Sequence, residues 1–459
     1  MKMFLTTAIS YTNGPPHIGH AYEIVVADII SRFNKLFGRK VHFLTGTDEH
    51  DQKIMKTAQS LGITPLDLCD QNVTLFKNLY KNLSIHYNDF IRTTEHRHHS
   101  TAQTIFQKCF ENDDIYLGEY SGWYNAREER FMTEMEAGQG DYKDTVTGKE
   151  LEKVSEPSYF FKMEKYRDPV KEYVKSQGFP DILNRLEEPL QDLSISRTSF
   201  DWGVPVPCDE KHVMYVWFDA LTNYISGSDG HWPPVHLIGR DIVWFHAVIW
   251  PCMLLSCGKE LPKKILVHGM ITDEKGQKMS KSVGNVVDPF DLLTKYSSDQ
   301  LRYYLIRAGS FGDDIKFSTP NLEKTSDTEL ANLYGNLVSR SFSLLEKQYE
   351  SVIPNVSHKF DGCKIMKQVE LLISEFELDE ALRVIVALLH ETNDWLYKVE
   401  PWKKKDDKVM AELFDRLTLA TFLLSPFIPE ATEIVSRRFV SDKVDTSKVI
   451  LFKKFATKY

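Results

Sequence analysis

Two short segments carry side chains that suit the binding of a nucleotide polyphosphate. The first spans residues 13–20, NGPPHIGH, and includes the imidazoles of His17 and His20. Prolines at a helix start cost little, because their missing N–H would be unpaired there anyway. The free N–H groups and the dipole of a helix N-terminus attract phosphate, and Gly19 leaves room for a flat ring such as adenine. Taken alone, the segment also fits an ordinary helix start with two surface histidines.

The second segment spans residues 278–282, KMSKS, and follows the turn residues 273–276, DEKG. Lysines on a loop of small residues can swing onto a polyphosphate and neutralise charge as it develops. The lysines concerned are Lys278 and Lys281. Taken alone, such a pair of lysines is most often a solvated surface turn.

The elements that must position these segments follow an α/β pattern. Hydrophobic periodicity predicts a strand at residues 4–9, a helix at 21–37 and a strand at 41–45. Strand, helix and strand in this order imply a parallel, Rossmann-type sheet with a crevice at the carboxyl ends of its strands. The pattern resumes with strands at 214–218, 235–238 and 264–268 and a helix at 242–257.

Two regions depart from this pattern. Residues 118–162 combine glycines, many charges and short aromatic runs, which indicates a small β-rich insertion. Pro320 marks a boundary, after which the periodicity is helical at 322–349, 363–376, 378–399 and 409–424. We therefore expect the first half of the catalytic domain at 1–117, a connective insertion at 118–200, the second half at 201–320 and an all-α domain at 321–459.

Composition excludes several classes of protein. The 459 residues are 42% hydrophobic and 26% charged, as in a globular protein, and the longest apolar stretch, residues 243–257, is shorter than the roughly 20 residues that a bilayer requires. The 6 cysteines are never spaced as CxxC, which argues against a disulfide framework or a zinc ribbon. Without a recognisable leader at the N-terminus, we expect a cytoplasmic protein. The net charge of −9 means that any nucleic acid must bind to a local patch.

Together, and in this order, the two segments form the HIGH and KMSKS signatures of class I aminoacyl-tRNA synthetases. The chain resembles the methionyl-tRNA synthetases over essentially its whole length, as further blocks at 8–11 (AISY), 47–50 (TDEH), 195–197 (ISR), 216–220 (VWFDA), 239–246 (GRDIVWFH) and 400–402 (EPW) indicate. The resemblance implies a ligase that forms methionyl-adenylate from L-methionine and ATP and then charges tRNA(Met). A catalytically silent tRNA-binding paralogue and a small nucleotidyltransferase of the same superfamily remain as alternatives.

The resemblance also assigns roles to individual residues. A thioether has almost no hydrogen-bonding capacity, so its pocket must select by shape and polarisable contact. Asp48 matches the carboxylate that holds the substrate's ammonium group. The expected methionine pocket contains Ile9, Tyr11, Asp48, Trp217, Ala220, Tyr224, Phe245, His246 and Trp250. The expected ATP-binding residues are His17, Gly19, His20, Glu23, Asp241, Lys278 and Lys281. The expected catalytic residues are His17, His20, Lys278, Lys281 and Arg197.

In the helical tail, two features are expected to read the anticodon. Asn332, Asn336 and Arg340 recur at i, i+4 and i+8, which places them on one helix face. Trp402 follows Pro401 and precedes three lysines, a setting that suits stacking on an unpaired base. The alternative for Trp402 is a core aromatic that caps a helix.

The insertion departs from the pattern of many methionyl-tRNA synthetases, whose zinc knuckle is built from paired cysteines. Residues 120–161 contain no cysteine, so the insertion resembles the metal-free form. We therefore expect no metal site and no zinc, only Mg²⁺ accompanying ATP. The histidines at 96, 98 and 99 are interpreted as a solvated helix start. Because no further module follows residue 459, we expect a monomer.

Overall fold

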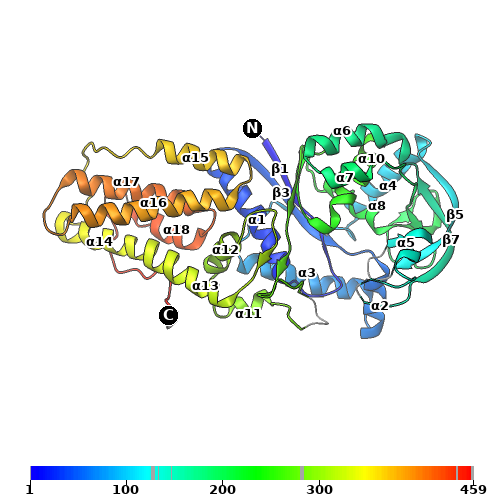
Figure 1. Ribbon diagram of the computed structural model, residues 1–459, viewed down its shortest axis with the longest axis horizontal. Coiled ribbons are helices and arrows are strands. Elements are labelled where there is room, and N and C mark those ends of the chain that lie inside the picture. Colours follow the sequence, from blue (N-terminus) through cyan, green and yellow to red (C-terminus); the bar gives the residue numbers. More distant parts are fainter. Residues whose placement is uncertain are drawn as a thin grey trace.

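A parallel sheet occupies the centre of an elongated molecule (Figure 1). The computed structural model describes residues 2–125, 130–132, 134–145, 147–279, 284–440 and 443–455, so Lys281 lies outside the described residues. The strand order is β13–β12–β1–β3–β2, with β4 also paired to β3, and each pairing is parallel. The strands are β1 (Lys2–Thr7), β2 (Ser10–Tyr11), β3 (Lys40–Asp48), β4 (Asp89–Arg92), β12 (Pro234–Gly239) and β13 (Lys264–His268). The α/β prediction is thereby confirmed.

Alternate residues of the central strands face two separate cores. Leu5 and Phe43 belong to the core that α1 (Ile18–Leu36) covers, whereas Phe4 and Leu44 belong to the core on the other face. Side chains alternate in this way because the side-chain period of a strand is two residues. Both faces of the sheet are therefore buried, as expected of a parallel sheet.

The expected strand at residues 214–218 is wrong. The strand β11 (Asp209–Met214) ends where it was expected to begin, and the short helix α8 (Val216–Ala220) follows. A short apolar run does not by itself distinguish a strand from a buried helical turn. Contacts from distant parts of the chain to Asp219, described below, hold this turn.

The helix expected at residues 242–257 is present but irregular. It starts as η2 (Arg240–Ile242), continues as the π-helical segment η3 (Phe245–Ile249) and ends as α10 (Trp250–Ser256). Pro251 stands in the first turn of α10 and lacks the N–H that a regular α-helix would need there. The π-helical turn lies directly before this proline, where the regular hydrogen-bond ladder is interrupted.

The insertion is β-rich, as predicted, and lies at one end of the molecule (Figure 1). In its antiparallel sheet, β5 (Ile115–Asn125) pairs with both β6 (Arg130–Met132) and β7 (Glu152–Phe161). A second antiparallel sheet has the strand order β10–β11–β9. The remaining elements of this region are α5 (Glu134–Gln139), α6 (Arg167–Gln177), α7 (Pro180–Arg185), β8 (Leu193–Ser194), β9 (Ser196–Arg197) and β10 (Pro205–Val206).

The helical tail forms the opposite end of the molecule (Figure 1). Pro320 stands in the first turn of α13 (Thr319–Thr325), where a proline is tolerated. The π-helical segment η4 (Ser326–Gly335) and α14 (Asn336–Tyr349) continue this helix. The other helices are α15 (Cys363–Ser374), α16 (Leu378–Val399), α17 (Asp407–Leu424) and α18 (Pro429–Ser436). None of the described helices is long and apolar enough to cross a membrane.

A buried arginine joins the tail to the sheet domain. Arg302, on α12 (Ser298–Arg307), is fully buried and lies 2.7 Å from the Asp28 carboxylate of α1. Its guanidinium also donates to the carbonyls of Leu83 and Pro426, at 2.9 and 2.7 Å. The elements not yet given are α2 (Gln52–Leu61), α3 (Pro65–Asn82), α4 (His96–Glu111), η1 (Glu164–Tyr166), α9 (Asn223–Ser226), β14 (Ile271–Thr272), α11 (Pro289–Leu293), β15 (Ile315–Lys316), β16 (Phe439–Val440) and β17 (Lys443–Val444).

Candidate active site

A pocket opens at the carboxyl ends of the central strands. Asp48 and Tyr11 end β3 and β2, and Ala8 and Ile9 follow β1. The pocket is lined by Ala8, Ile9, Tyr11, Asp48, Trp217, Ala220, Leu221, Asn223, Tyr224, Ile242 and His246. The structure therefore brings together the predicted methionine-pocket residues, apart from Phe245 and Trp250.

Phe245 and Trp250 support the wall of this pocket from behind. The ring of Phe245 stacks on the indole of Trp217 with centroids 3.7 Å apart. Trp250 is fully buried and packs 6.0 Å from the ring of Tyr224. Sequence reasoning missed Ala8, Leu221, Asn223 and Ile242, although each lies in or beside one of the quoted blocks.

The polar groups of the pocket wall are held neutral and in fixed orientations. His246 Nδ1 donates to the Ile242 carbonyl at 3.0 Å, so Nε2 accepts the hydroxyl hydrogen of Tyr224 at 2.7 Å. Burial lowers the pKa of His246 to about 4 and raises the pKa of Tyr224. His246 and Tyr224 are therefore both uncharged at neutral pH.

Asp48 is the one acid among the described residues that line the pocket. Its neighbour Glu49 is buried and committed elsewhere, since Arg92 donates to both carboxylate oxygens at 2.7 and 3.0 Å. Thr47 and Thr94 also donate to Glu49, each at 2.6 Å. Only Asp48 is placed to meet a cation in this pocket.

The HIGH histidines form the N-terminal cap of α1. His17 Nδ1 accepts from the Gly19 amide and His20 Nδ1 accepts from the His17 amide, both at 3.1 Å. Their rings stack with centroids 3.9 Å apart. Burial, helped by His17, keeps the pKa of His20 well below its usual value, so this ring is neutral at pH 7.

Gly19 lies close to the ring of His17. A Cβ atom at Gly19 would stand 2.9 Å from Cε1 of His17. The lack of a side chain at Gly19 therefore leaves room for the His17 ring, and its expected role in admitting a flat ligand ring stays a prediction.

Three of the other predicted ATP residues lie in two pairs. Glu23 accepts from Nε2 of His268, at the end of β13, at 3.0 Å. Burial opposes protonation of His268, but Glu23 outweighs it and raises the pKa of this imidazole. Lys278 Nζ lies 3.2 Å from the Asp241 carboxylate, and both side chains are exposed. The lysine loop is thus tied to the strand end that carries the rest of the site.

Arg197 is buried in β9. Its guanidinium donates to Ser194 Oγ at 2.9 Å and to the Ser196 carbonyl at 2.6 Å, and lies over the Tyr215 ring at 4.4 Å.

A buried cluster behind the pocket was not predicted. The Asp219 carboxylate, on α8, bonds His50 Nδ1 at 2.7 Å and His98 Nε2 at 2.6 Å, and the three side chains are buried. Burial alone would raise the pKa of Asp219, but the two histidines outweigh it and hold the pKa low. Because the partners are more than a hundred residues apart in the chain, sequence spacing offered no signal.

The expectation of a solvated histidine cluster at the start of α4 is therefore only partly right. His96 is exposed, as expected, but His98 is fully buried against Asp219. His99 is half-buried, and burial with His50 nearby lowers its pKa to about 4. The helix turns every third and fourth residue inward, which the adjacent histidine letters do not reveal.

The predicted anticodon residues gather on one surface of the helical tail. Asn332, Asn336 and Arg340 are exposed along η4 and α14. The Arg340 guanidinium lies 5.8 Å from the ring of Trp402, which is 42% exposed. Pro401 is buried, and its carbonyl accepts from Gln348 Nε2 at 2.7 Å. Trp402 is therefore not a core aromatic.

Comparisons with known proteins agree with this geometry. The sequence profile of tRNA synthetases class I (M) matches residues 3–342. A methionine--tRNA ligase of Rhizobium meliloti (strain 1021) is 41% identical over 463 residues, covering 93% of this chain and 90% of that protein. The corresponding ligase of Brucella suis biovar 1 (strain 1330) is also 41% identical and covers 94% of this chain and 90% of its own length.

Solved structures show the same similarity. Mycobacterium tuberculosis methionyl-tRNA synthetase in complex with methionyl-adenylate superposes with a TM-score of 0.92 at 34% identity, covering 99% of this chain and 100% of that one. The free state of the same enzyme gives a TM-score of 0.83 at 30% identity, covering 100% of this chain and 99% of that one. The chain belongs to the methionyl-tRNA synthetases, a family of class I aminoacyl-tRNA synthetases.

Proposed function

We propose that the chain is a methionine–tRNA ligase, which joins L-methionine to tRNA(Met) through methionyl-adenylate. The observation that carries this proposal is the pocket at the carboxyl edge of the sheet. It combines one acid, Asp48, with an uncharged aromatic wall, and it lies beside the HIGH helix start. A zwitterionic amino acid with an apolar, polarisable side chain fits both features.

In this proposal Asp48 pairs with the methionine ammonium, while Trp217, Tyr224 and the His246 wall contact the thioether. The methionine carboxylate oxygen attacks the α-phosphorus of ATP in line, and pyrophosphate leaves. A terminal ribose hydroxyl of the tRNA then attacks the adenylate carbonyl, and AMP leaves. No covalent enzyme intermediate is needed, so positioning and electrostatics carry the rate.

The remaining predicted residues would handle ATP. His17, Gly19, His20, Glu23 and Asp241 would bind the nucleotide, with Mg²⁺ on its phosphates. Lys278 would leave Asp241 for the pyrophosphate as negative charge develops there, together with Lys281. We also propose Arg197 as an assisting cation. Its guanidinium lies over the ring of Tyr215, the residue before α8.

We further propose that the domains follow the expected boundaries, 1–117, 118–200, 201–320 and 321–459, and that the last of them binds the anticodon. We propose a monomer whose insertion contains no zinc.

A chelator tests the absence of zinc from the insertion. Treatment with a strong chelator, followed by dialysis, should leave methionine activation near its starting rate. A loss that added zinc restores would contradict this.

Methionine-dependent exchange of labelled pyrophosphate into ATP tests the function, followed by charging of tRNA(Met). Exchange should require methionine and should not occur with leucine at the same concentration. Lys278→Ala should lower exchange by about 10²–10³, because losing one donor to developing charge typically has this effect. A silent paralogue would show no exchange in the wild type.

A further inference from the structure

We propose that His42, Asp229 and His231 form a binding site for one divalent transition-metal ion such as Zn²⁺ or Co²⁺, distinct from the catalytic pocket. His42 is near the start of β3, whereas Asp48 ends this strand. At about 3.3 Å per residue, the two lie roughly 20 Å apart along the strand. The site therefore faces the amino end of the sheet, and the methionine pocket faces the carboxyl end.

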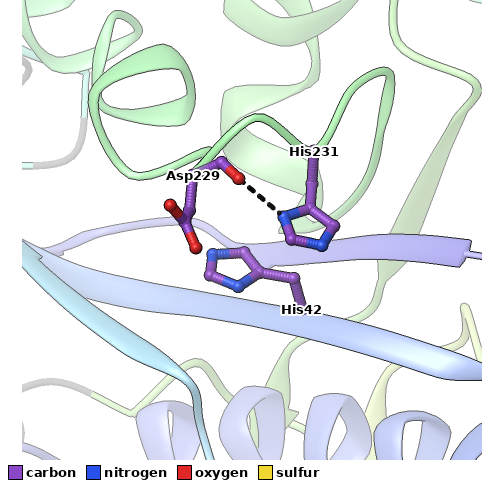
Figure 2. Close-up of side chains that lie close together, drawn as sticks. All are labelled: His42, Asp229 and His231. Carbon is purple, nitrogen blue, oxygen red and sulfur yellow. Dashed lines mark hydrogen bonds between the residues drawn. The ribbon is translucent and has the colours of Figure 1, made fainter.

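The three side chains come from two separate parts of the fold and converge on one point. Each offers a ligand atom, and these atoms all lie within 4.8 Å of one another. The rings of His42 and His231 are nearly parallel, 5° apart, with centroids separated by 4.7 Å. Figure 2 shows the Asp229 carboxylate beside the His42 ring. His231 belongs to the same loop as Asp229, and its ring stacks on the His42 ring.

The spacing is close to that of a formed metal site. A tetrahedral zinc bound at 2.0–2.1 Å holds two ligand atoms about 3.4 Å apart. The ligand atoms now lie at most 4.8 Å from one another. Each distance between two of them must therefore shorten by no more than about 1.4 Å on metal binding. The turn at Asp229 and Gly230 lies on an exposed loop, which can supply this movement.

Backbone carbonyls already orient both imidazoles. His42 Nε2 donates to the Gly227 carbonyl at 3.0 Å. His231 Nδ1 donates to the carbonyls of Ser228 and Asp229, at 3.2 and 3.1 Å. These contacts fix the two ring planes, and an ion bound at the His42 nitrogen beside the Asp229 carboxylate would replace the proton that this imidazole donates to Gly227. Two imidazoles and one carboxylate suit zinc, cobalt or nickel, whereas magnesium and calcium prefer oxygen ligands alone.

The loop conformation supports a binding role for Asp229. This residue has φ of 44°, in the left-handed region that side chains other than glycine rarely adopt, and Gly230 follows at 73°. Such residues concentrate at ligand sites. His42 is buried, His231 is half-buried and Asp229 is exposed, so an ion has a polar entrance and an enclosed partner.

Metal binding here would tie the loop to the sheet. The loop follows α9, which carries the pocket residues Asn223 and Tyr224, and leads into β12. An ion would therefore stabilise the folded chain without taking part in the reaction. Because bound metal displaces protons from its ligands, we expect weaker binding as the pH falls.

The test uses the full, untagged chain, stripped with chelator and dialysed. Cys208 and Cys363 are exposed and are replaced by serine, so that thiolates do not compete for the ion. Titration with Co²⁺ is followed by visible absorption, and titration with Zn²⁺ by calorimetry. The variants are Asp229→Asn, which tolerates a positive φ, and His231→Gln. His390→Gln is the matched control, because His390 is exposed on α16.

We expect one equivalent of metal to bind with the absorption of nitrogen and oxygen ligands. Each site variant should lower the affinity by at least about tenfold, as should occur when one of three ligands is lost, and the control should not change it. The metal should also raise the unfolding temperature of the parent chain but not of the site variants. The absence of stoichiometric binding would overturn the proposal, as would unchanged affinity in either site variant. Methionine-dependent pyrophosphate exchange should be the same in all variants, so the site and the proposed function fail separately.

Discussion

Asp48 and Glu49 are adjacent acids with different tasks. Glu49 accepts from an arginine and two threonines, whereas Asp48 faces the pocket. Their order in the sequence does not distinguish them. The difference arises because successive side chains at the end of a strand point to opposite faces. Arg92 on β4 lies on the face of Glu49 and pairs with it.

We predict that Asp48→Asn raises the Kd for methionine by at least about 10², because a buried ammonium without its carboxylate loses roughly 3–5 kcal/mol. ATP binding should be unchanged. Isothermal titration with methionine measures the effect, and Asp70→Asn is the control, since Asp70 is an exposed partner of Arg92. Wild-type affinity in Asp48→Asn would contradict the assignment, because Glu49 has no free oxygen to replace it.

The pocket histidine makes the fold sensitive to acid. His246 is 2% exposed, and its folded pKa of about 4 lies below the ordinary value of 6.5. The unfolded chain therefore binds the extra proton first, and stability falls as the pH drops from about 6.5 to 4. The full effect is about 3 kcal/mol, at 1.36 kcal/mol per pKa unit.

We predict that His246→Gln reduces this dependence. Glutamine can donate to the Ile242 carbonyl or accept from Tyr224, but it does not titrate. The free energy of unfolding in urea should therefore fall less steeply between pH 6.5 and 4.5 in the variant, by up to about 1.4 kcal/mol per pH unit. Equal slopes in variant and wild type would show that His246 is not held neutral. Comparing variant with wild type separates the contribution of His246 from those of other groups. Asp299, whose pKa is raised to about 6, makes stability rise as the pH falls, which is the opposite direction.

At the scale of elements, the sequence predicted regular pieces well. The helix Leu378–Val399 and the strand Lys264–His268 agree with their predicted ranges, because long amphipathic periodicity and a bounded apolar run are local signals. The segment 214–218 failed because its conformation depends on distant partners. His50 and His98 reach Asp219 from other elements and hold the turn of α8.

The same dependence explains which site residues were found. Trp217 and His246 were identified because they belong to short blocks of a family pattern. The proposed metal-binding cluster at His42 and His231 was missed, since these residues are 189 positions apart by their numbers and belong to no block. Family patterns capture residues that share a reaction, and three-dimensional proximity adds the others.

We predict that Asp219→Asn raises the KM for methionine about tenfold and leaves the KM for ATP within about twofold. An amide can accept from one histidine but presents N–H groups to the other. The hydrogen bonds of His50 and His98 that hold α8 therefore weaken. Trp217 and Ala220 of the pocket belong to this helix. Steady-state pyrophosphate exchange measures both constants, and His96→Gln, an exposed change on α4, is the control. An equal rise in the KM for methionine and the KM for ATP would indicate a general loss of folding instead.

At the scale of the molecule, the sheet with its pocket and the helical tail with the proposed anticodon surface lie in different parts of an elongated chain (Figure 1). The pocket is at the sheet, and Trp402 follows α16 in the helical tail. Buried contacts join them at the centre, since Arg302 binds Asp28 of α1 and the carbonyls near α18. A change confined to the surface of the tail should therefore leave the pocket intact.

We predict that Trp402→Ala separates the two half-reactions. The indole is 42% exposed, with Arg340 and Tyr397 beside it, so its loss should change stability little. Stacking of an unpaired base on such a ring is worth about 1–3 kcal/mol. Charging of tRNA(Met) should then fall by about tenfold or more in kcat/KM, while methionine-dependent pyrophosphate exchange stays at the wild-type rate.

The neighbouring arginine sharpens this test. If Arg340 and Trp402 hold the same base, the double variant should lose less than the sum of the single losses, because the second change removes an interaction already weakened. Leu371→Ala is the control, an exposed apolar residue on α15. Additive losses would place the two residues on different nucleotides, whereas a parallel fall in exchange would mean that the tail and the pocket are coupled. Unchanged charging in every variant would place anticodon recognition on another surface of the tail.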